Sequence, residues 1–304
     1  MPGVTLATKT LAAFEDAVAR DQGAAYRTWL GKVIPHIGDA YRGAEEDGFR
    51  SHMGASLIGG ECGRAVWYGF RWATKPKFSG RVLRLFNRGH LEEARFIALL
   101  LTAGVQVYQQ DANGKQYRIS SFGGHFGGSG DGVAVGLPDL APGTAALLEC
   151  KTHNDASFKV LKKEGVRSAK FEHFVQMQIY MRKMGLAVAL YLAVNKNDDE
   201  IYAELVALDP AVGDEFLARA HKIIPLHAAP TKISKSPGWK ACMWCDHKPV
   251  CHLRVAPERN CRTCDAILPQ DDGTWYCRLW GEVRSKEAQL IGCSEYTVNT
   301  SMTS

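Results

Sequence analysis

Two carboxylates and a lysine are the first residues whose types and spacing could carry out chemistry. Asp131 stands between two glycines, and Glu149 and Lys151 flank Cys150. Side chains two apart in a strand point to the same face, so a strand here would present the Glu149 carboxylate and the Lys151 ammonium together. If Asp131 opens an adjacent strand, its carboxylate could lie beside that of Glu149. Two hard oxygen ligands suit Mg²⁺ or Mn²⁺ better than zinc.

Such a site contains the minimum needed to hydrolyse a phosphodiester bond. A bound divalent ion lowers the pKa of its water and stabilises the extra negative charge of a phosphoryl transition state. Lys151 could orient that water or assist its deprotonation. The structural alternative is that Glu149 and Lys151 form only an exposed cross-strand ion pair, because a Glu-x-Lys tripeptide is common.

Two further segments carry polar residues that could join this site. Gln176 and Tyr180 are four apart on a predicted helix, so both lie on one face and could contact substrate or the lysine. His90 follows Gly89 at the predicted start of another helix, with Glu93 one turn on, and could supply an imidazole to the metal. A polar helix edge and a helix cap are the alternative interpretations of these two segments.

The nine cysteines divide into two groups of four and one remainder, Cys150. A CxxC pair with a third cysteine six positions later supplies three thiolates for one ion or cluster, and the isolated N-terminal cysteine is the candidate for the fourth. The members of this first thiol group are Cys62, Cys242, Cys245 and Cys251. The members of the second thiol group are Cys261, Cys264, Cys277 and Cys293.

The spacing of the second thiol group favours a structural zinc ion over a second cluster. The last 50 residues offer few apolar side chains, so a metal would supply much of their folding free energy. His252 is an alternative ligand for either group. Buried, unligated thiols are the competing interpretation, which fits Cys150 better.

Composition is that of an intracellular globular protein with a modest positive charge. The chain has 304 residues, 46% of them hydrophobic, a net charge of +5 and a pI near 8.7. The N-terminus lacks a signal-peptide core and the longest apolar runs fall short of a membrane span of about 20 residues, so we expect a cytoplasmic protein without membrane contact. Two basic runs are either solvated faces or phosphate-binding surfaces. They comprise Lys75, Lys77, Arg81, Arg84 and Arg88, and Lys159, Lys162, Lys163, Arg167 and Lys170.

Periodicity predicts an α/β order of helix, three or four strands, helix and strand. A helical segment over 8–36 leads into a helix over 90–102. Strands are predicted over 105–109 and 117–120, joined as a hairpin across Asn113-Gly114, and then over 131–135 and 147–151. A helix over 171–184 precedes a strand over 187–194, which turns at 195–199 into another strand.

Together these motifs resemble the PD-(D/E)XK nuclease superfamily, and within it the RecB-like branch with an iron–sulfur cluster that includes CRISPR-associated and phage-encoded exonucleases. The resemblance covers about residues 50–255. It rests on Gly89-His90…Glu93, Gly130-Asp131-Gly132, Glu149-Cys150-Lys151, Gln176…Tyr180, the divided first thiol group, and the segment 56–64 with Trp67.

This resemblance implies an αβββαβ core and a role for each matching residue. The implied ligands of the divalent ion are His90, Asp131, Glu149 and the backbone carbonyl of Cys150. Lys151 would act on the water, while Gln176 and Tyr180 would support the substrate or the lysine. The first thiol group would hold a 4Fe-4S cluster. We expect a helical segment over 1–50, the nuclease core with its cluster over 51–255, and a four-cysteine metal-binding lobe over 256–304.

The predicted function is divalent-metal-dependent exonuclease activity on DNA, acting on single-stranded ends or the ends of duplexes. A role in phage or bacterial DNA replication, recombination or degradation follows from the resemblance. The alternatives are a structure-specific endonuclease and, from another class, a non-catalytic iron–sulfur protein that binds DNA or senses redox state. A buried-core role competes with base stacking for four aromatic residues, and His125 is a candidate phosphate contact in the glycine-rich run 123–132. The aromatic residues are Trp67, Tyr68, Phe70 and Trp72.

Overall fold

The computed structural model describes residues 3–37, 49–111 and 116–304, which form two compact units. Unit 1 comprises Met1–Ala44, Phe78–Ile119 and Ser129–Gly213. Unit 2 comprises Glu45–Lys77, Ser120–Gly128 and Asp214–Ser304. Each unit is therefore assembled from three separate segments of the chain. The division at residues 50 and 255 stays a prediction.

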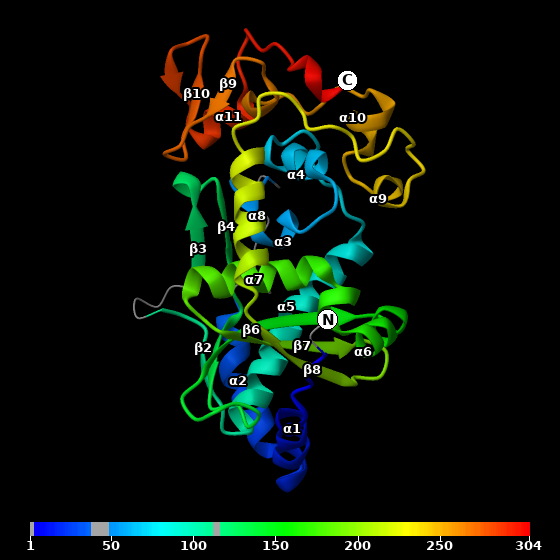
Figure 1. The fold of residues 1–304 in the computed structure, drawn as a ribbon, viewed down its shortest axis with the longest axis vertical. Coiled ribbons are helices and arrows are strands. Elements are labelled where there is room, and N and C mark those ends of the chain that lie inside the picture. Colours follow the sequence, from blue (N-terminus) through cyan, green and yellow to red (C-terminus); the bar gives the residue numbers. More distant parts are fainter. Residues whose placement is uncertain (1–2, 38–48, 112–115) are drawn as a thin grey trace. The chain divides into compact units, whose positions relative to one another are not determined.

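Unit 1 is built on a five-stranded mixed sheet with the order β2-β5-β6-β7-β8 (Figure 1). All neighbouring strands are antiparallel except β6 and β7, which are parallel. A parallel pair requires a long crossover, which α6 and α7 provide. The strands are β2 (Gln106–Tyr108), β5 (Gly132–Val135), β6 (Ala145–His153), β7 (Val188–Asn195) and β8 (Ile201–Ala207). The helices are α1 (Thr8–Arg20), α2 (Ala24–Val33), α5 (Gly80–Thr102), α6 (Asp155–Ala169) and α7 (Phe171–Met184), with a 3-10 turn at Ile34–His36.

Alternation along β6 separates an apolar layer from a polar one. Leu148 is fully buried in a core that includes Phe14 of α1 and Phe96 of α5, and Cys150 packs against the same core. Glu149 faces the opposite layer, where its carboxylate meets α7. The strand therefore places its functional side chains and its core side chains on different faces, as the period of two requires.

The mixed α/β architecture and several predicted elements agree with the sequence. The predicted order is present as α5, β2, β5, β6, α7, β7 and β8, with α6 as an addition. Helix α7 has the predicted bounds and ends at Gly185, whose φ of 69° gives the left-handed cap that glycine favours. The predicted N-terminal helical segment is two helices, because Gly23 adopts a φ of 80° between them.

Two local predictions were wrong. Helix α5 begins ten residues before the predicted start, where the Ser79 hydroxyl accepts a hydrogen bond from Val82 N–H, so His90 lies inside the helix and does not cap it. The strands expected to form a hairpin lie in different sheets, because β2 pairs with β5 while β3 (Arg118–Ser121) pairs with β4 (Phe126–Ser129). A single bridge joins Gln110 to Gln116, and the predicted Asn113-Gly114 turn lies outside the described residues.

Unit 2 contains short elements arranged around two small sheets. Strand β1 (Met53–Gly54) runs parallel to β4 in the order β1-β4-β3, and the second sheet has the order β11-β10-β9. The strands of this second sheet are β9 (Ile267–Pro269), β10 (Trp275–Cys277) and β11 (Glu282–Val283). The α-helices are α3 (Ala55–Ile58), α4 (Gly63–Phe70), α9 (Lys240–Met243), α10 (Lys248–Leu253) and α11 (Lys286–Ile291), and α8 (Pro210–Ile223) leads into the unit. The 3-10 turns are at Phe122–Gly124, Cys261–Thr263 and Thr300–Met302.

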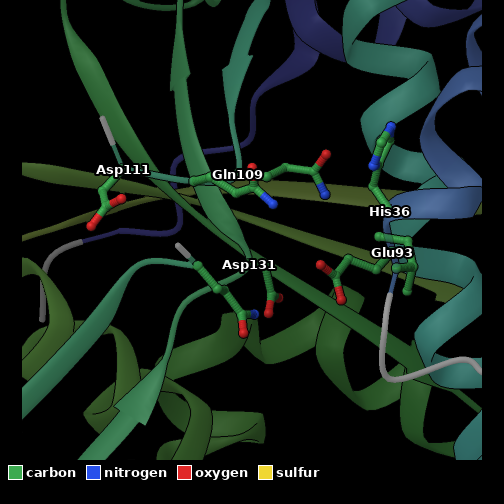
Figure 2. Close-up of a pocket in the computed structure, with 8 residues that line it drawn as sticks. His36, Glu93, Gln109, Asp111 and Asp131 are labelled. Atoms are coloured by element: carbon green, nitrogen blue, oxygen red, sulfur yellow. The ribbon is translucent and has the colours of Figure 1, made fainter. Parts of the chain in front are cut away.

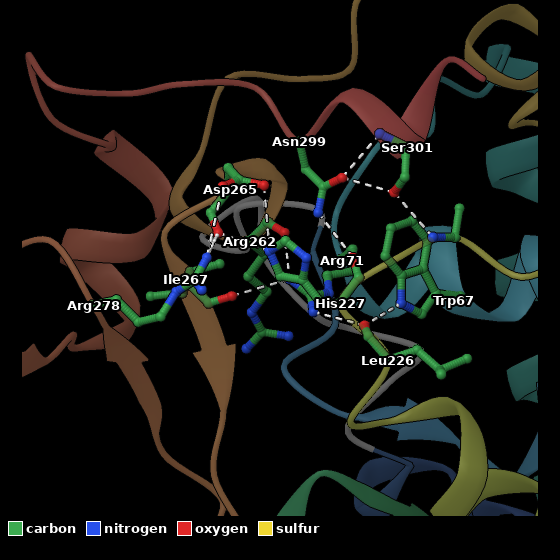
Figure 3. Close-up of polar contacts among 11 residues, drawn as sticks. Trp67, Arg71, Leu226, His227, Arg262, Asp265, Ile267, Arg278, Asn299 and Ser301 are labelled. Carbon is green, nitrogen blue, oxygen red and sulfur yellow. Dashed lines mark hydrogen bonds and ion pairs between the residues drawn. The ribbon is translucent and has the colours of Figure 1, made fainter.

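Two buried arginines connect the segments of unit 2 (Figure 3). The Arg262 guanidinium lies 3.7 Å from the centroid of the Trp72 ring and donates hydrogen bonds of 3.0 Å to the carbonyl oxygens of Ser51 and Phe70. Arg71 donates a hydrogen bond of 2.8 Å to the Leu226 carbonyl oxygen. Because a buried cation must keep its hydrogen bonds, these contacts hold the first and third segments together.

Within the described residues, no helix combines the length and the apolar character needed to cross a membrane.

The core of unit 1 gives a direct test of this architecture. Leu190 is fully buried in β7, so Leu190→Ala should lower the free energy of unfolding by about 2–5 kcal/mol, through lost transfer energy and the cavity left behind. Guanidinium denaturation followed by circular dichroism measures the change. The control is Leu83→Ala, at a leucine that is 52% exposed, which should change stability by no more than about 0.5 kcal/mol. Equal losses in both variants would contradict the packing described for β7.

Candidate functional site

The Asp131 carboxylate is held against the strand that carries Glu149 and Lys151. Asp131 immediately precedes β5, which pairs antiparallel with β6 in the register Gly132 to Leu148. This register places Asp131 beside the middle of β6, where Cys150 N–H donates a 2.7 Å hydrogen bond to Asp131 Oδ2. The structure therefore brings together the three residues that the sequence singled out first.

Glu149 is almost completely buried and has two polar partners on the same side of the sheet. Its Oε2 accepts a hydrogen bond of 3.1 Å from Gln176 Nε2 of α7. Its Oε1 forms an ion pair with Lys151 Nζ, whose side chain remains 26% exposed. The Lys151 ammonium is thus paired with Glu149, and its positive charge also acts on the Asp131 carboxylate.

The electrostatics of the two acids favour a further positive charge. Burial raises the pKa of Asp131 and of Glu149, and Lys151 only partly opposes this. Burial lowers the pKa of Lys151, but the two carboxylates outweigh it and hold that pKa above its usual value. A divalent ion beside both carboxylates would stabilise their charged forms, so the donor chemistry here fits Mg²⁺ or Mn²⁺.

A cavity of about 590 Å³ in unit 1 opens beside Asp131 (Figure 2). Glu93 of α5 and Asp131 both line it, and Figure 2 shows their carboxylates turned towards one another. The charge of Glu93 also acts on the Cys150 thiol, whose pKa is raised by burial and by the neighbouring acids. His90, three residues earlier on α5, lies close enough to lower the pKa of Asp131. The other lining residues are His36, Ile37, Gln109, Gln110, Asp111 and Gln116.

Glu93 is the acidic residue whose place in the site the sequence analysis did not assign. It follows His90 by three residues, so both approach the site from one turn of α5. The resemblance gave the ligand role on this helix to His90, and Glu93 entered the motif only as its neighbour one turn on. The structure adds a third carboxylate to the candidate metal-binding residues.

Helix α7 supports both acids through residues one turn apart. Gln176 donates to the Glu149 carboxylate, and the Tyr180 hydroxyl donates a 2.9 Å hydrogen bond to the Ser129 carbonyl oxygen, two residues before Asp131. Both side chains are buried. These contacts position the acids, while the predicted support of the substrate or the lysine stays a prediction.

The first thiol group lines one pocket of unit 2. Cys62 directly precedes α4, Cys242 lies in α9, Cys251 lies in α10, and Cys245 follows α9, yet all four border the same pocket together with His252. Burial raises the pKa of the Cys242 thiol, and the charges of Cys62 and Cys251 raise it further. Four cysteines from two distant segments therefore border one pocket, and thiols among them interact electrostatically.

The second thiol group lines another pocket of the same unit. Cys261 and Cys264 lie at a 3-10 turn, where Cys264 N–H donates to the Cys261 carbonyl oxygen at 2.9 Å. Cys277 ends β10, Cys293 follows α11, and both border the pocket. All nine cysteines are free thiols, and Cys150 belongs to neither pocket.

Residues that line the same pocket do not necessarily stand in metal-binding geometry. Among the residues described, no group of three or more His, Cys, Asp or Glu side chains stands in metal-binding geometry. The acids and the thiols are neighbours, and their side chains would have to converge further on an ion or cluster. The features that suit a metal are therefore the chemical type of these oxygen and sulfur donors and their grouping.

The four aromatic residues considered for base stacking belong to the core. Trp67, Tyr68, Phe70 and Trp72 are each at most 2% exposed, and both indole N–H groups donate to backbone carbonyl oxygens. Burial leaves no ring face for a base, so the stacking prediction is wrong and the core interpretation holds. His125 is also buried, against Phe70 and Trp275, so it does not offer its ring to a phosphate.

The two basic runs differ in how far acids neutralise them. In the second run, Lys159 pairs with Asp155 at 2.8 Å, Lys162 pairs with Glu200, and Arg167 pairs with Asp209 at 3.3 Å. The sequence from residue 77 to 91, which contains most of the first run, has no acidic residue. The arginines of the first run therefore have no acidic neighbour along their own helix before Glu92.

Comparisons with known proteins give distant structural likenesses. No protein-family model and no curated protein matches the chain. The chain is similar to LHK-Exo, an alkaline exonuclease from Laribacter hongkongensis, with 16% identity over 57% of this chain and 86% of that chain and a TM-score of 0.41. LHK-Exo in complex with dAMP covers the same shares with 19% identity and a TM-score of 0.40. SSO0001 gives 14% identity over 77% of this chain and 100% of that chain, with a TM-score of 0.37.

Metal binding at the acids can be measured without activity. Mg²⁺ or Mn²⁺ should raise the thermal stability of the wild-type protein, because an ion that binds only the folded state stabilises it. Asp131→Asn should abolish most of that rise, since one carboxylate that would hold the ion is lost. Differential scanning calorimetry over a metal titration measures both. Asp16→Asn, at an exposed acid on α1, is the control and should respond like wild type. An equal response in all three proteins would exclude this site.

Proposed function

We propose that this chain is a divalent-metal-dependent nuclease of the PD-(D/E)XK type. The observation that supports the proposal most strongly is the grouping of Asp131, Glu149 and Lys151 on two paired strands beside a cavity that Glu93 also lines. A cross-strand ion pair on an exposed surface would not bury one carboxylate almost completely and tie a second to the intervening backbone N–H.

In such an enzyme, residues of unit 1 would bind the metal ion and act on the water or the phosphate. Asp131, Glu149 and the Cys150 carbonyl would hold the divalent ion, and Glu93 or His90 would complete its ligands from α5. When bound, the ion lowers the pKa of a water molecule and offsets negative charge on the phosphate. The Lys151 ammonium, held by Glu149, would orient the attacking water or stabilise a non-bridging phosphate oxygen.

Gln176 and Tyr180 are positioning residues, which would act through the two acids. Gln176 fixes the rotamer of Glu149 through its amide, and Tyr180 anchors the backbone just before Asp131. Loss of either should misplace a carboxylate without removing it. The cavity beside the acids would admit the scissile phosphate.

The predicted substrate is DNA with a free end, and single-stranded ends above all. This preference follows from the resemblance to RecB-like exonucleases, as does a role in phage or bacterial DNA replication, recombination or degradation. Cleavage of closed circles would instead identify a structure-specific endonuclease. Binding without cleavage would identify a non-catalytic protein that binds DNA or senses redox state through its cluster.

We also propose that the first thiol group holds a 4Fe-4S cluster and that the second holds zinc. Four cysteines from two distant segments meet at one pocket in the first group, and four from the C-terminal stretch meet at another in the second. Thiolate ligands suit both metals. The cluster's role would be structural, because Cys62 and Cys242 would be joined across the whole catalytic segment.

The nuclease proposal predicts a loss of cleavage without loss of binding. Glu149→Ala and Lys151→Ala should each reduce shortening of end-labelled linear DNA by about a hundredfold or more, because the first removes a ligand of the ion and the second removes a positive charge that would stabilise the transition state. Chelator should abolish the activity of the wild type. Lys183→Ala, at an exposed lysine of α7, is the matched control and should retain activity.

Substrate form separates the alternatives in the same assay. Shortening of linear but not circular DNA would support the exonuclease, and cutting of circles the endonuclease. DNA binding should survive in both site variants. Full activity of Lys151→Ala, or cleavage that persists in chelator, would contradict the proposed chemistry.

The two thiol groups can be distinguished by metal content. Anaerobically purified Cys242→Ala should lose iron and the broad visible absorption of an iron–sulfur cluster while retaining zinc. Cys264→Ala should lose zinc and keep iron. Cys150→Ala, at the cysteine outside both groups, should keep both metals. Elemental analysis with visible spectroscopy measures all three, and iron retained by Cys242→Ala would exclude the assigned cluster ligands.

A further inference from the structure

A chain of buried hydrogen bonds lies beside the acids and has no part in the proposed chemistry. The Tyr191 hydroxyl on β7 lies 3.0 Å from His153 Nε2 on β6 and 2.9 Å from His173 Nδ1 on α7. His153 Nδ1 lies 2.9 Å from the Ser157 hydroxyl on α6. One tyrosine hydroxyl therefore connects two strands to α7, and His153 extends the connection to α6.

This network lies on the face of the sheet that carries Glu149. Tyr191 is in register with Glu149 on the parallel strand β6, so the two side chains point to the same face. Lys151 and His153 follow Glu149 at intervals of two along β6 and share that face. Gln176 of α7 contacts the same layer through Glu149. The acid, the lysine and the network are thus neighbours beneath the crossover helices.

Helix α7 meets the underlying layer at three points along one side. His173, Gln176 and Tyr180 occupy positions i, i+3 and i+7, which lie within about 60° of one another around the helix. The first contacts Tyr191, the second donates to Glu149, and the third donates to a backbone carbonyl oxygen at the end of β4. Because one turn separates His173 from Gln176, the contact of His173 determines where the Gln176 amide can reach.

The two imidazoles provide this contact without adding charge beside the acids. Burial and then the charge of Lys151 lower the pKa of His173 to about 3. Burial and the charges of nearby lysines lower the pKa of His153 to about 4. Both rings are therefore neutral at neutral pH, and a neutral ring does not repel a cation bound at the acids.

The network requires one arrangement of the helix on the strands. Tyr191 is fully buried and His153 is 5% exposed. A hydroxyl can donate one hydrogen bond and accept two, so Tyr191 can satisfy both rings at once. A displaced partner would leave buried polar atoms unpaired, which is unfavourable. A shift of α7 along β7 would break the contact of His173 together with that of Gln176.

We propose that Tyr191 is a positioning residue of the metal site formed by the acids, which acts through α7 on Gln176 and so on the Glu149 carboxylate. This inference deepens the proposed function and rests on it, because it concerns the same acids. Removal of a hydrogen-bond partner of a metal ligand commonly lowers metal affinity by about 10–100-fold. Tyr191 is further from the ligand than Gln176, so we expect the lower end of that range.

Mn²⁺ binding measured by isothermal titration calorimetry in the absence of DNA tests this role. Tyr191→Phe should weaken the affinity by about tenfold, because loss of the hydroxyl unpairs His173 and releases the first turn of α7. His173→Ala should have a similar effect. His173→Asn, whose side-chain amide can take the place of Nδ1, should recover most of the affinity. His173 is only half-buried, so its two variants decide the question if Tyr191→Phe does not fold.

Tyr202→Phe is the matched control for loss of a buried tyrosine hydroxyl. Tyr202 lies on β8 of the same sheet, is 5% exposed, and donates a 2.6 Å hydrogen bond to Glu204 Oε2. Its variant should also lower the melting temperature, because it too unpairs a buried polar group. It should bind Mn²⁺ within about twofold of wild type.

A double variant tests whether the effect passes through Gln176. Gln176→Ala should itself weaken Mn²⁺ binding. Addition of Tyr191→Phe should then cause little further loss, because the tyrosine acts through that amide. Losses that multiply in the double variant would show that the two residues act independently and would contradict the proposed route.

Failure of the nuclease proposal and failure of this inference give different results. Mn²⁺ binding that Asp131→Asn weakens, in a wild-type protein that cleaves no DNA, would exclude the nuclease and leave the test of Tyr191 valid. Unchanged Mn²⁺ affinity in Tyr191→Phe and His173→Ala, with loss in Asp131→Asn, would overturn the positioning role alone. Equal losses of affinity in Tyr191→Phe and Tyr202→Phe would also overturn it, because the network would then only stabilise the fold. A wild-type protein that binds no Mn²⁺ would overturn both.

Discussion

The need to partner buried carboxylates shapes the centre of unit 1. Glu149 is 1% exposed, and removal of a charged acid from water is tolerated only with compensating contacts. Lys151 and Gln176 supply them for Glu149, and the Cys150 N–H supplies one for Asp131. This arrangement requires the antiparallel register of β5 on β6, because a shift of β5 by one residue would turn Asp131 to the opposite face of the sheet from Glu149.

The crossover between β6 and β7 supports the same centre. Parallel strands need a helical connection, and α7 is the part of that connection which packs behind the acids. Residues 176 and 180 lie one turn apart, so a single helix face can contact both Glu149 and the backbone near Asp131. A connection required by topology thus also fixes the geometry of the site. The other helix of the crossover, α6, carries ion pairs with neighbouring acids on its surface.

Strong local patterns made part of this structure predictable. Alternation identified β6 and the face shared by Glu149 and Lys151, and the glycine after Met184 marked the end of α7. The start of α5 was missed because residues 80–88 are exposed, and a segment without a buried face leaves no apolar periodicity to recognise. Local turn chemistry also suggested a hairpin at Asn113-Gly114, but tertiary pairing places the two strands in different sheets.

Residues defined by long-range packing were beyond the reach of the sequence. Trp67 and Trp72 are residues of a type that can stack on bases. Only the fold shows that both rings are buried and that Arg262 lies over Trp72. Glu93 likewise became a site residue only when the cavity was seen, because its neighbour His90 carried the more recognisable chemistry. Grouping of the cysteines was easier, since the CxxC spacing is local, although the partnership of Cys62 depends on unit 2 being assembled from distant segments.

The two thiol groups would stabilise unit 2 in different ways. A metal centre joining Cys62 to Cys242 closes a loop that contains the whole candidate active site, and the chain-entropy relation for cross-links assigns about 5 kcal/mol to a loop of that length. The second thiol group lies within one short stretch, for which the same relation gives about 4 kcal/mol. Buried arginines already connect the first and third segments, so the first centre would reinforce an existing contact. Its loss should therefore loosen the packing of the first segment of unit 2 on the third, whereas loss of the second should act on the C-terminal sheet alone.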